Sequence, residues 1–201
     1  MKEFAAACVQ IAVTPNDVQA NFDKGVAWLE RAVGEYEAEL VVFPETVTTT
    51  FVTGLETDEL WGLVDSVPGR ITRDVQAAAK SLGVHVVWPS YRRGPERGGI
   101  YNSAIETVLG SIGMIICYDG DFPEPSCLLA VKGAEVIVRP SALLRSFDIW
   151  YITNAARAYD NHVYIVATNS VGPDAGGDHR RQTRPRPAAL RDLGQQESAD
   201  L

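Results

Sequence analysis

Short apolar runs that alternate with helical patterns constrain the fold of this 201-residue chain more than any other feature. After the potential caps Asn16 and Asp17, apolar side chains recur at the spacing of an amphipathic helix, at Val18, Phe22, Val26, Leu29 and Val33. Further helices are expected at residues 70–82, 123–132 and 148–160, and strands at 4–11, 39–43, 84–89, 101–108, 111–117, 135–138 and 162–168. Because strands and helices alternate along the chain, the pattern predicts an α/β fold.

Composition limits the domain count and the classes of partner. The length and the 46% hydrophobic content fit one domain with a sizeable core. The formal net charge of -8 and the pI of about 4.9 argue against nucleic acids and anionic membranes, because both require a basic surface. Small molecules are the expected partners. No apolar stretch approaches the roughly 20 residues of a membrane span, and the first residues lack the apolar core of a signal peptide, so we expect a cytoplasmic location.

Residues 178–201 differ in character from the rest of the chain. They are rich in arginine, contain two prolines and carry few apolar side chains. We expect a disordered tail here and a folded domain over residues 1–177. A nucleic-acid-binding arm is the alternative for the basic cluster, but the acidic remainder of the chain favours an appended tail. The cluster consists of Arg180, Arg181, Arg184 and Arg186.

The cysteines indicate reduced thiols rather than a disulfide framework or a zinc site. There are three, Cys8, Cys117 and Cys127, and no two form a Cys-x-x-Cys pair. Cys8 falls within the first expected strand, where we expect it to pack in the core as a small hydrophobic side chain. We therefore expect no metal site.

Two strand ends carry the residues best placed for chemistry. Cys117 ends the apolar run Gly113-Met114-Ile115-Ile116 and precedes an expected helix, while Glu45 closely follows the run 40–43. Parallel strands bring their last side chains to the same edge of a sheet. We therefore expect Cys117 and Glu45 to meet there as nucleophile and base.

Four neighbouring residues have structural or binding interpretations. Asp119 and Glu124 are expected to cap the helix after Cys117. Arg139 follows the expected strand at 135–138, and Trp150 lies in the expected helix at 148–160. We predict that Arg139 and Trp150 border a substrate pocket.

Histidine offers an alternative base. His85 lies inside a strand pattern and His162 at a strand start, which favours packed side chains. A Cys-His pair that uses Cys117 remains open at this point. Arg157 and Asn161 lie four residues apart on one helix face and are expected to make local hydrogen bonds.

A series of short motifs runs through the chain in a fixed order. They are Val42-Phe43-Pro44-Glu45, Tyr101-Asn102-Ser103-Ala104, Ile112 to Asp119, Phe122-Pro123-Glu124, Arg157 to Asn161 and Ala167 to Gly172. In this order they resemble the nitrilase (carbon-nitrogen hydrolase) superfamily over residues 4–177. The resemblance implies an α-β-β-α sandwich, here incomplete, and a homo-oligomer in which these layers pair between subunits.

The resemblance also implies an activity. Family members hydrolyse nitriles, amides or carbamoyl groups without a metal or organic cofactor, through a cysteine thioester and a Glu-Lys-Cys triad. Glu45 and Cys117 match two members of that triad. The helix N-terminus after Cys117, including the Tyr118 backbone N–H, is expected to favour the thiolate and to stabilise the oxyanion.

The triad lysine has no counterpart. The family carries it, with a second glutamate, in a segment between the Tyr-Asn-Ser strand and the cysteine strand, but residues 108–110 join these strands almost directly. No lysine of the chain stands in the matching context, neither Lys2, Lys24, Lys80 nor Lys132. The alternative function is therefore an inactive family member that only binds a ligand or a partner subunit.

The carboxyl-terminal part also departs from the family, because the arginine-rich residues 178–201 stand where further strands usually follow. A missing inner segment together with such a tail suggests an internal deletion with a shifted reading frame, or an errant gene model. This hypothesis predicts that the nucleotide sequence encodes the lysine segment or the family ending in another frame.

Overall fold

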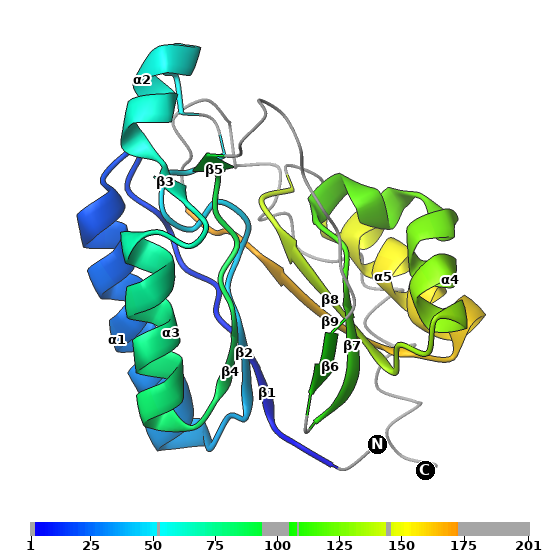
Figure 1. The fold of residues 1–201 in the computed structure, drawn as a ribbon. Helices are drawn as coiled ribbons and strands as arrows, with labels where there is room; N and C mark the ends of the chain where they lie inside the picture. The colour runs from blue at the N-terminus through cyan, green and yellow to red at the C-terminus, as the bar shows by residue number, and fades with distance from the viewer. Residues whose placement is uncertain (1–2, 52, 94–104, 108, 144–145, 173–201) are drawn as a thin grey trace.

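The computed structural model describes residues 3–51, 53–93, 105–107, 109–143 and 146–172 (Figure 1). The strands are β1 (Ala6–Cys8), β2 (Leu40–Val42), β3 (Asp65–Ser66), β4 (His85–Val87), β5 (Arg92–Arg93), β6 (Ile105–Thr107), β7 (Gly110–Met114), β8 (Val136–Ser141) and β9 (Tyr164–Asn169). The helices are α1 (Val18–Tyr36), α2 (Thr57–Leu63), α3 (Arg70–Leu82), α4 (Pro123–Val131) and α5 (Phe147–Asn161), with a 3-10 helix η1 at Cys117–Asp121.

Two sheets form the centre of the molecule. One has the order β1-β2-β4 and is parallel throughout, and the other has the order β6-β7-β8-β9, in which only β6 runs antiparallel to its neighbour. The strands β3 and β5 form a separate two-residue pairing. All strands that lead to the predicted site residues therefore run parallel within their sheets.

Alternating side chains along β2 and β8 explain why the sheets stack. In β2, Val41 packs against the cluster that includes Leu29 of α1, whereas Leu40 and Val42 face the second sheet. In β8, Val136 and Val138 join that same inter-sheet cluster, while Ile137 packs on the side of Leu129 from α4. The result is the predicted α-β-β-α layering, with α1 and α3 on one outer face and α4 and α5 on the other (Figure 1).

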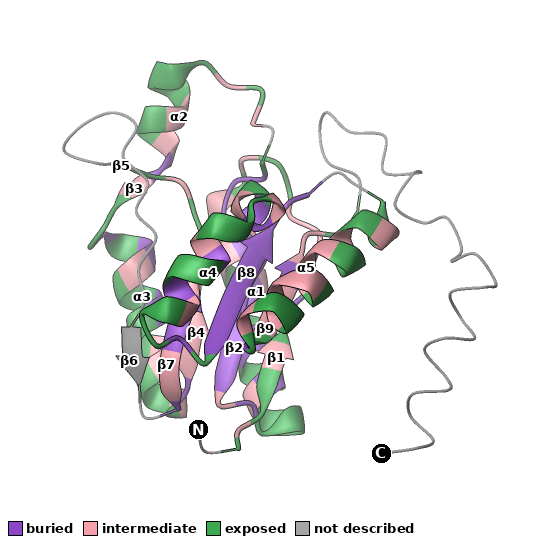
Figure 2. Ribbon diagram, turned by 90° about the vertical axis from the view of Figure 1, so that its right-hand side faces the viewer, coloured by how far each residue is buried: buried purple, intermediate pink, exposed green. Residues whose placement is uncertain are grey.

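Burial follows these layers. Every residue of β2 and of β8 is buried, and the helices that cover them expose their outer faces (Figure 2). The two sheets also touch through β1 and β9, where the Thr168 hydroxyl donates to the Val9 carbonyl at 2.9 Å. Among the described residues, no helix is long and apolar enough to cross a membrane.

Most element predictions agree with the structure to within a few residues. The long amphipathic helix is α1, and its N-cap is Asp17, whose carboxylate accepts the Ala20 N–H at 3.1 Å. The short helix α2 was not predicted, since none of its residues is buried and its sequence carries no apolar stripe. The Tyr101-to-Ala104 motif and the tail at 178–201 lie outside the described residues.

The expectation for Cys8 is wrong in one respect. Cys8 lies in β1, as expected, but its side chain is exposed. The reason is that β1 is the outermost strand of its sheet and that Ala7, on the opposite face of the strand, points into the helix-side core instead.

Two glycines of α1 give a matched test of core packing. Gly25 is buried, and a Cβ there would overlap the Trp88 ring, which packs on Phe43 with ring centroids 4.6 Å apart. Gly34 is exposed with open space around it. We expect Gly25→Ala to lower the free energy of unfolding by about 1–3 kcal/mol through overpacking. Gly34→Ala should raise it by about 0.5–1 kcal/mol through helix propensity. Urea denaturation of both variants measures this, and equal effects would contradict the packing described here.

Candidate active site

Glu45 lies just beyond the carboxyl end of β2, where it reaches the second sheet. Its backbone N–H donates to the Ser141 carbonyl at 3.3 Å, and its Oε2 accepts the Ala142 N–H at 3.1 Å. Ser141 is the last residue of β8. The carboxylate is thus held at the seam between the two sheets, at the carboxyl ends of parallel strands.

Cys117 is delivered to the same place by the strand β7. The chain continues from β7 through Ile115, whose N–H donates to the Val138 carbonyl at 3.1 Å, and Cys117 then opens η1. Its φ of 48° lies in the left-handed region, and only 8% of the residue is exposed. The thiol lies beside the Glu45 carboxyl group, close enough for each group to shift the pKa of the other. The structure therefore brings together the predicted nucleophile and base.

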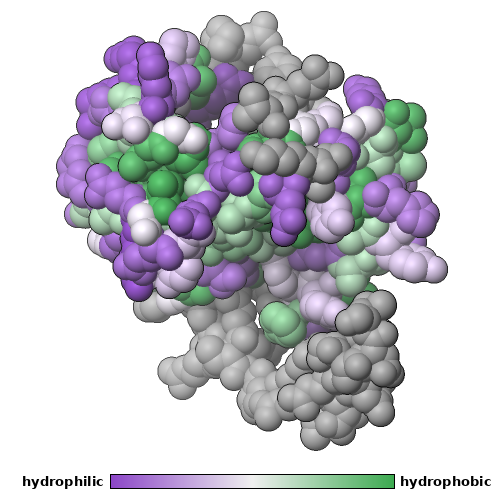
Figure 3. All heavy atoms as spheres, turned by 90° about the horizontal axis from the view of Figure 1, so that it is seen from below, coloured by the Kyte–Doolittle hydropathy of each residue, from purple (hydrophilic) through white to green (hydrophobic). Residues whose placement is uncertain are grey.

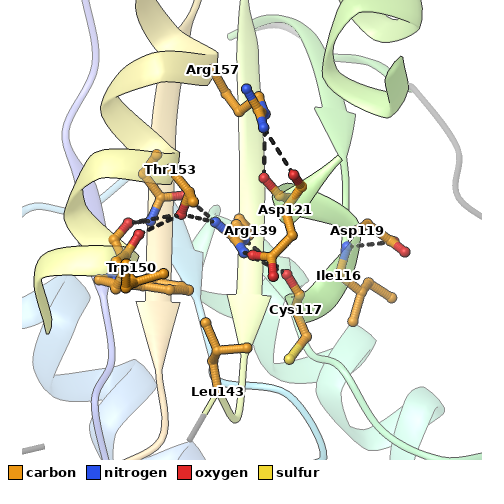
Figure 4. Close-up of polar contacts among 12 residues, drawn as sticks. Ile116, Cys117, Asp119, Asp121, Arg139, Leu143, Trp150, Thr153 and Arg157 are labelled. Atoms are coloured by element: carbon orange, nitrogen blue, oxygen red, sulfur yellow. Dashed lines mark hydrogen bonds and ion pairs between the residues drawn. The ribbon is translucent and has the colours of Figure 1, made fainter. Parts of the chain in front are cut away.

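The turn after Cys117 is a 3-10 helix, and the α-helix α4 begins later, at Pro123. Asp119 caps this turn, as predicted, because its Oδ2 accepts the Ile116 N–H at 3.0 Å (Figure 4). Glu124 lies in the first turn of α4, although its side chain makes no capping hydrogen bond. The ring of Tyr118 is exposed and meets Phe122 edge-on at 5.1 Å, so only its backbone is placed for the proposed role at the oxyanion.

The thiol is neutral in this environment. Burial raises the pKa of Cys117 to about 12, and the charge of Glu45 and its hydrogen bond act in the same direction. The Ala142 N–H and the Arg139 charge lower the pKa but are outweighed. Burial and a neighbouring carboxylate both disfavour a second negative charge here, and the contribution of the backbone after Cys117 to thiolate stability stays a prediction.

Burial also raises the pKa of Glu45 above its ordinary value. The hydrogen bonds from Cys117 and Ala142 oppose this shift, and the nearby charge of Asp119 adds to it. A carboxylate with a raised pKa is a stronger base than an exposed one. The pair can thus act as a neutral thiol beside a basic carboxylate.

Arg139 is completely buried and points toward the turn that begins at Cys117 (Figure 4). Its Nε and Nη2 both donate to the Cys117 carbonyl, at 2.9 and 2.7 Å. Trp150, of α5, lies half-buried with its ring 4.8 Å from the guanidinium carbon. Direct contact of Arg139 and Trp150 with substrate stays a prediction, whereas the structure shows that the two side chains contact each other and that Arg139 contacts the turn.

The described lysines and histidines occupy other regions. Lys80 lies in the last turn of α3 and Lys132 is the C-cap of α4, so both precede the starts of strands, at the edge opposite Cys117. His85 begins β4 and His162 follows α5 before β9, at that same edge. Within the described ranges, these positions argue against a Cys-His pair. Figure 3 views this edge, where hydrophilic side chains surround smaller hydrophobic patches.

The remaining polar groups make local contacts. Lys24 donates to the Ala12 carbonyl at 3.0 Å, and Lys2 lies outside the described residues. Arg157 and Asn161 make local hydrogen bonds, as predicted: the Asn161 amide donates to the Arg157 carbonyl at 2.8 Å. In the part of the chain that the structure describes, no group of three or more His, Cys, Asp or Glu side chains could hold a metal ion.

Sequence reasoning missed the backbone of Ala142. Its N–H donates to Glu45 at 3.1 Å and also lies close enough to the Cys117 sulfur to lower the thiol pKa, so it acts on both groups. A backbone donor leaves no mark in residue type, and the only signal was its place at a strand end. The acceptors around Arg139 were missed as well, because Thr153 and Asn154 lie in the following helix, α5, and reach Arg139 only through the packing of that helix.

In the structure, a buried cysteine lies beside a carboxylate between two sheets that are flanked by helical layers. The chain belongs to the carbon-nitrogen hydrolase family, whose sequence model matches residues 5–106 and 103–187. It is similar to a formamidase from Bacillus cereus (strain Q1), with 29% identity over 212 residues, which cover 85% of this chain and 63% of that protein. The chain thus spans less than two thirds of the length of these curated relatives.

Solved structures of the nitrilase superfamily share the fold. A branch 10 member from Saccharomyces cerevisiae superposes with a TM-score of 0.70 at 24% identity, covering 86% of this chain and 77% of that one. An amidase from Nesterenkonia sp. gives a TM-score of 0.64 at 20% identity, covering 85% and 77%. A CN-hydrolase superfamily protein from Xanthomonas campestris gives 0.72 at 18%, covering 99% and 96%.

The coupling between Cys117 and Glu45 can be measured by alkylation. Since the thiol is neutral, we expect iodoacetamide to label Cys117 slowly at pH 8, with a rate that rises about tenfold per pH unit until its pKa is approached. Glu45→Gln removes a negative charge that raises the pKa of Cys117, so labelling at pH 8 should become at least about tenfold faster. Peptide mass spectrometry follows the rate, with exposed Cys127 as the internal control. A rate that Glu45→Gln leaves unchanged or lowers would contradict the geometry.

Burial of Glu45 also predicts a pH dependence of stability. Because the pKa of Glu45 is raised in the fold, the stability contributed by its protonated form is complete below its unfolded-state pKa and lost as pH rises through the folded-state pKa. The native chain therefore loses stability as the pH rises from 4 to 7, whereas Glu45→Gln does not. The free energy of unfolding of Glu45→Gln, relative to that of the native chain, should increase over this range.

Asp65 supplies a control of opposite sign for this stability measurement. Burial acts to raise the pKa of Asp65, but N–H groups of Ser66, Ile71 and Arg70 outweigh it and the pKa is lowered. Asp65→Asn should therefore lose relative stability as pH rises through the acid range. Chemical denaturation across pH measures both variants, and parallel trends for the two would refute the assignment.

Proposed function

We propose that this chain hydrolyses carbon-nitrogen bonds of small amide, nitrile or carbamoyl compounds through a cysteine thioester. The observation that carries the proposal is the placement of buried Cys117 beside Glu45 at the seam of the two sheets. Membership of the carbon-nitrogen hydrolase family supports it independently. The pair contains the two groups that acyl transfer by a thiol requires, a nucleophile and a base within hydrogen-bond reach.

For an amide, the steps follow from the protonation states of this pair. Glu45 accepts the thiol proton while the Cys117 sulfur bonds to the carbonyl carbon, and the carbonyl oxygen becomes an oxyanion. Glu45 then gives its proton to the leaving nitrogen as the carbon-nitrogen bond breaks. Water next attacks the thioester as Glu45 takes one of its protons. The carbon-sulfur bond then breaks, and the proton returns to Cys117.

The oxyanion needs hydrogen-bond donors beside the thiol. The Tyr118 backbone N–H directly follows Cys117 within the turn and is the donor we assign to it. The Ala142 N–H approaches from the end of β8 and holds the base. No cofactor or metal is required by these steps.

Small amides are the favoured substrate class. The similar protein from Bacillus cereus is a formamidase, and the Nesterenkonia amidase has been solved in complex with butyramide. A glutamate-to-glutamine mutant of that amidase carries an acetamide moiety from fluoroacetamide on its active-site cysteine. Formamide and fluoroacetamide are therefore suitable first probes for this chain.

The second candidate function is binding without turnover, and the lysines favour it. Lys24, Lys80 and Lys132 all lie away from Cys117, and loss of one oxyanion-hole donor lowers rates about 10²- to 10³-fold.

A missing segment near residues 108–110 is supported by two observations. The family model matches in two stretches that meet at 103–106. The formamidase alignment spans 212 positions, whereas 85% of 201 residues is about 171, so about 40 positions face gaps in this chain.

A homo-oligomer remains part of the proposal, as does a cytoplasmic location. Support for self-association comes from α5, which has no buried residue in the isolated chain. Its side chains Ile149, Ile152 and Tyr159 are 43%, 56% and 81% exposed. Such an apolar helix face is typical of protein–protein contact.

Hydrolysis and trapping together test the proposed function. Ammonia release from formamide should depend on both groups, so that Cys117→Ala abolishes it and Glu45→Gln lowers it by about 10²- to 10⁴-fold, the usual contribution of general acid–base catalysis. Fluoroacetamide should add to Cys117 and to neither Cys8 nor Cys127, as mapped by peptide mass spectrometry. No ammonia and no selective adduct from a folded chain would leave binding without turnover as the function.

A further inference from the structure

The guanidinium of Arg139 is saturated by protein acceptors. The side chain is fully buried, and guanidinium offers five N–H donors. The acceptors are the Cys117 carbonyl for Nε at 2.9 Å and for Nη2 at 2.7 Å, Asp121 Oδ1 for Nη2 at 3.3 Å, Thr153 Oγ1 for Nη1 at 3.1 Å and Asn154 Oδ1 for Nη1 at 2.9 Å. Five contacts for five donors leave no N–H for a substrate.

Two of these hydrogen bonds end on the nucleophile's own carbonyl. Cys117 has a φ of 48°, a left-handed conformation that costs a non-glycine residue roughly 1–2 kcal/mol. A fork of two donors on one carbonyl fixes the direction of that peptide group. Because the peptide direction and φ together set where the side chain points, Arg139 restrains the thiol through the backbone.

The surrounding turn is shaped to hold the guanidinium. A Cβ at Gly120 would overlap the guanidinium atoms, so the backbone of η1 lies directly against Arg139. Asp121, in the same turn, supplies the ion pair that a buried cation requires. Trp150 places its ring 4.8 Å from the guanidinium carbon, from the side of α5 (Figure 4). The arginine therefore connects β8 and α5 to the turn of the nucleophile.

We propose that Arg139 is a positioning residue, which holds Cys117 in the orientation that faces Glu45, and that it does not bind substrate. This inference rests on the proposed function, because it assigns Arg139 a role in the Cys117–Glu45 pair. It replaces the sequence-based prediction that Arg139 borders the pocket. Trp150, Thr153 and Asn154 then act on the nucleophile only through the guanidinium.

A double-mutant cycle tests the positioning role with a readout that mere stability does not move. The quantity measured is the effect of Glu45→Gln on the rate at which iodoacetamide labels Cys117 at pH 8. In the native background this effect should be at least about tenfold. In an Arg139→Lys background it should fall to within about twofold, because lysine keeps the charge but cannot place two donors on the Cys117 carbonyl.

Arg157→Lys is the matched control. Arg157 donates to the Gly120 and Asp121 carbonyls of the same turn, at 3.3 and 3.0 Å, and its contacts do not include Cys117. Its replacement should preserve the tenfold effect of Glu45→Gln. Loss of the effect in both arginine variants would mean that any loosening of the turn is sufficient, which would overturn the specific role of Arg139.

Thr153→Val keeps the inference testable where Arg139→Lys does not fold, as judged by circular dichroism. It removes one guanidinium acceptor and should reduce the effect of Glu45→Gln without touching Cys117. A full tenfold effect in Arg139→Lys, or in Thr153→Val where that variant is needed, would overturn the inference. Absence of the effect in the native background would instead mean that Cys117 and Glu45 do not form a pair, and the proposed function would fail first.

Discussion

The contact between the end of β2 and the end of β8 organises this molecule. Glu45 bonds Ser141 through its backbone and Ala142 through its carboxylate, at 3.3 and 3.1 Å. Both contacts cross from one sheet to the other, so they fix the registry of the two sheets at the edge where Cys117 arrives. A single residue therefore links the packing of the sandwich to the geometry of its candidate site.

The resulting site is costly to maintain. Burial raises the pKa values of both Glu45 and Cys117, and the charge of Glu45 further disfavours ionisation of the thiol. The buried cation Arg139 is already engaged with the backbone of the turn. Burial and the charge of Glu45 are the causes that keep the thiol neutral.

Periodicity and parallel topology were sufficient to predict the α/β class and the meeting of Glu45 with Cys117, whereas the α-β-β-α layers were predicted from the resemblance to the family. Parallel strands in an α/β fold end at the same edge of a sheet. Glu45 and Cys117 could therefore be placed together, although they are 72 positions apart in the sequence. The role of Ala142 could not be predicted, because a backbone N–H is common to nearly every residue. The exposure of Cys8 was not predicted, because it depends on the order of the strands in the sheet. The saturation of the Arg139 donors was not predicted either, because it depends on side chains that α5 contributes.

Raman spectroscopy of the thiol S–H stretch most directly tests the claim that Cys117 is a neutral donor to Glu45. The spectrum would be recorded across pH in the Cys8→Ser, Cys127→Ser chain, with and without Glu45→Gln, so that one thiol is observed. The account predicts a hydrogen-bonded S–H band that persists well above pH 9 and that changes position in Glu45→Gln. A band that disappears near the ordinary thiol pKa of about 8.5 and is indifferent to Glu45 would contradict it.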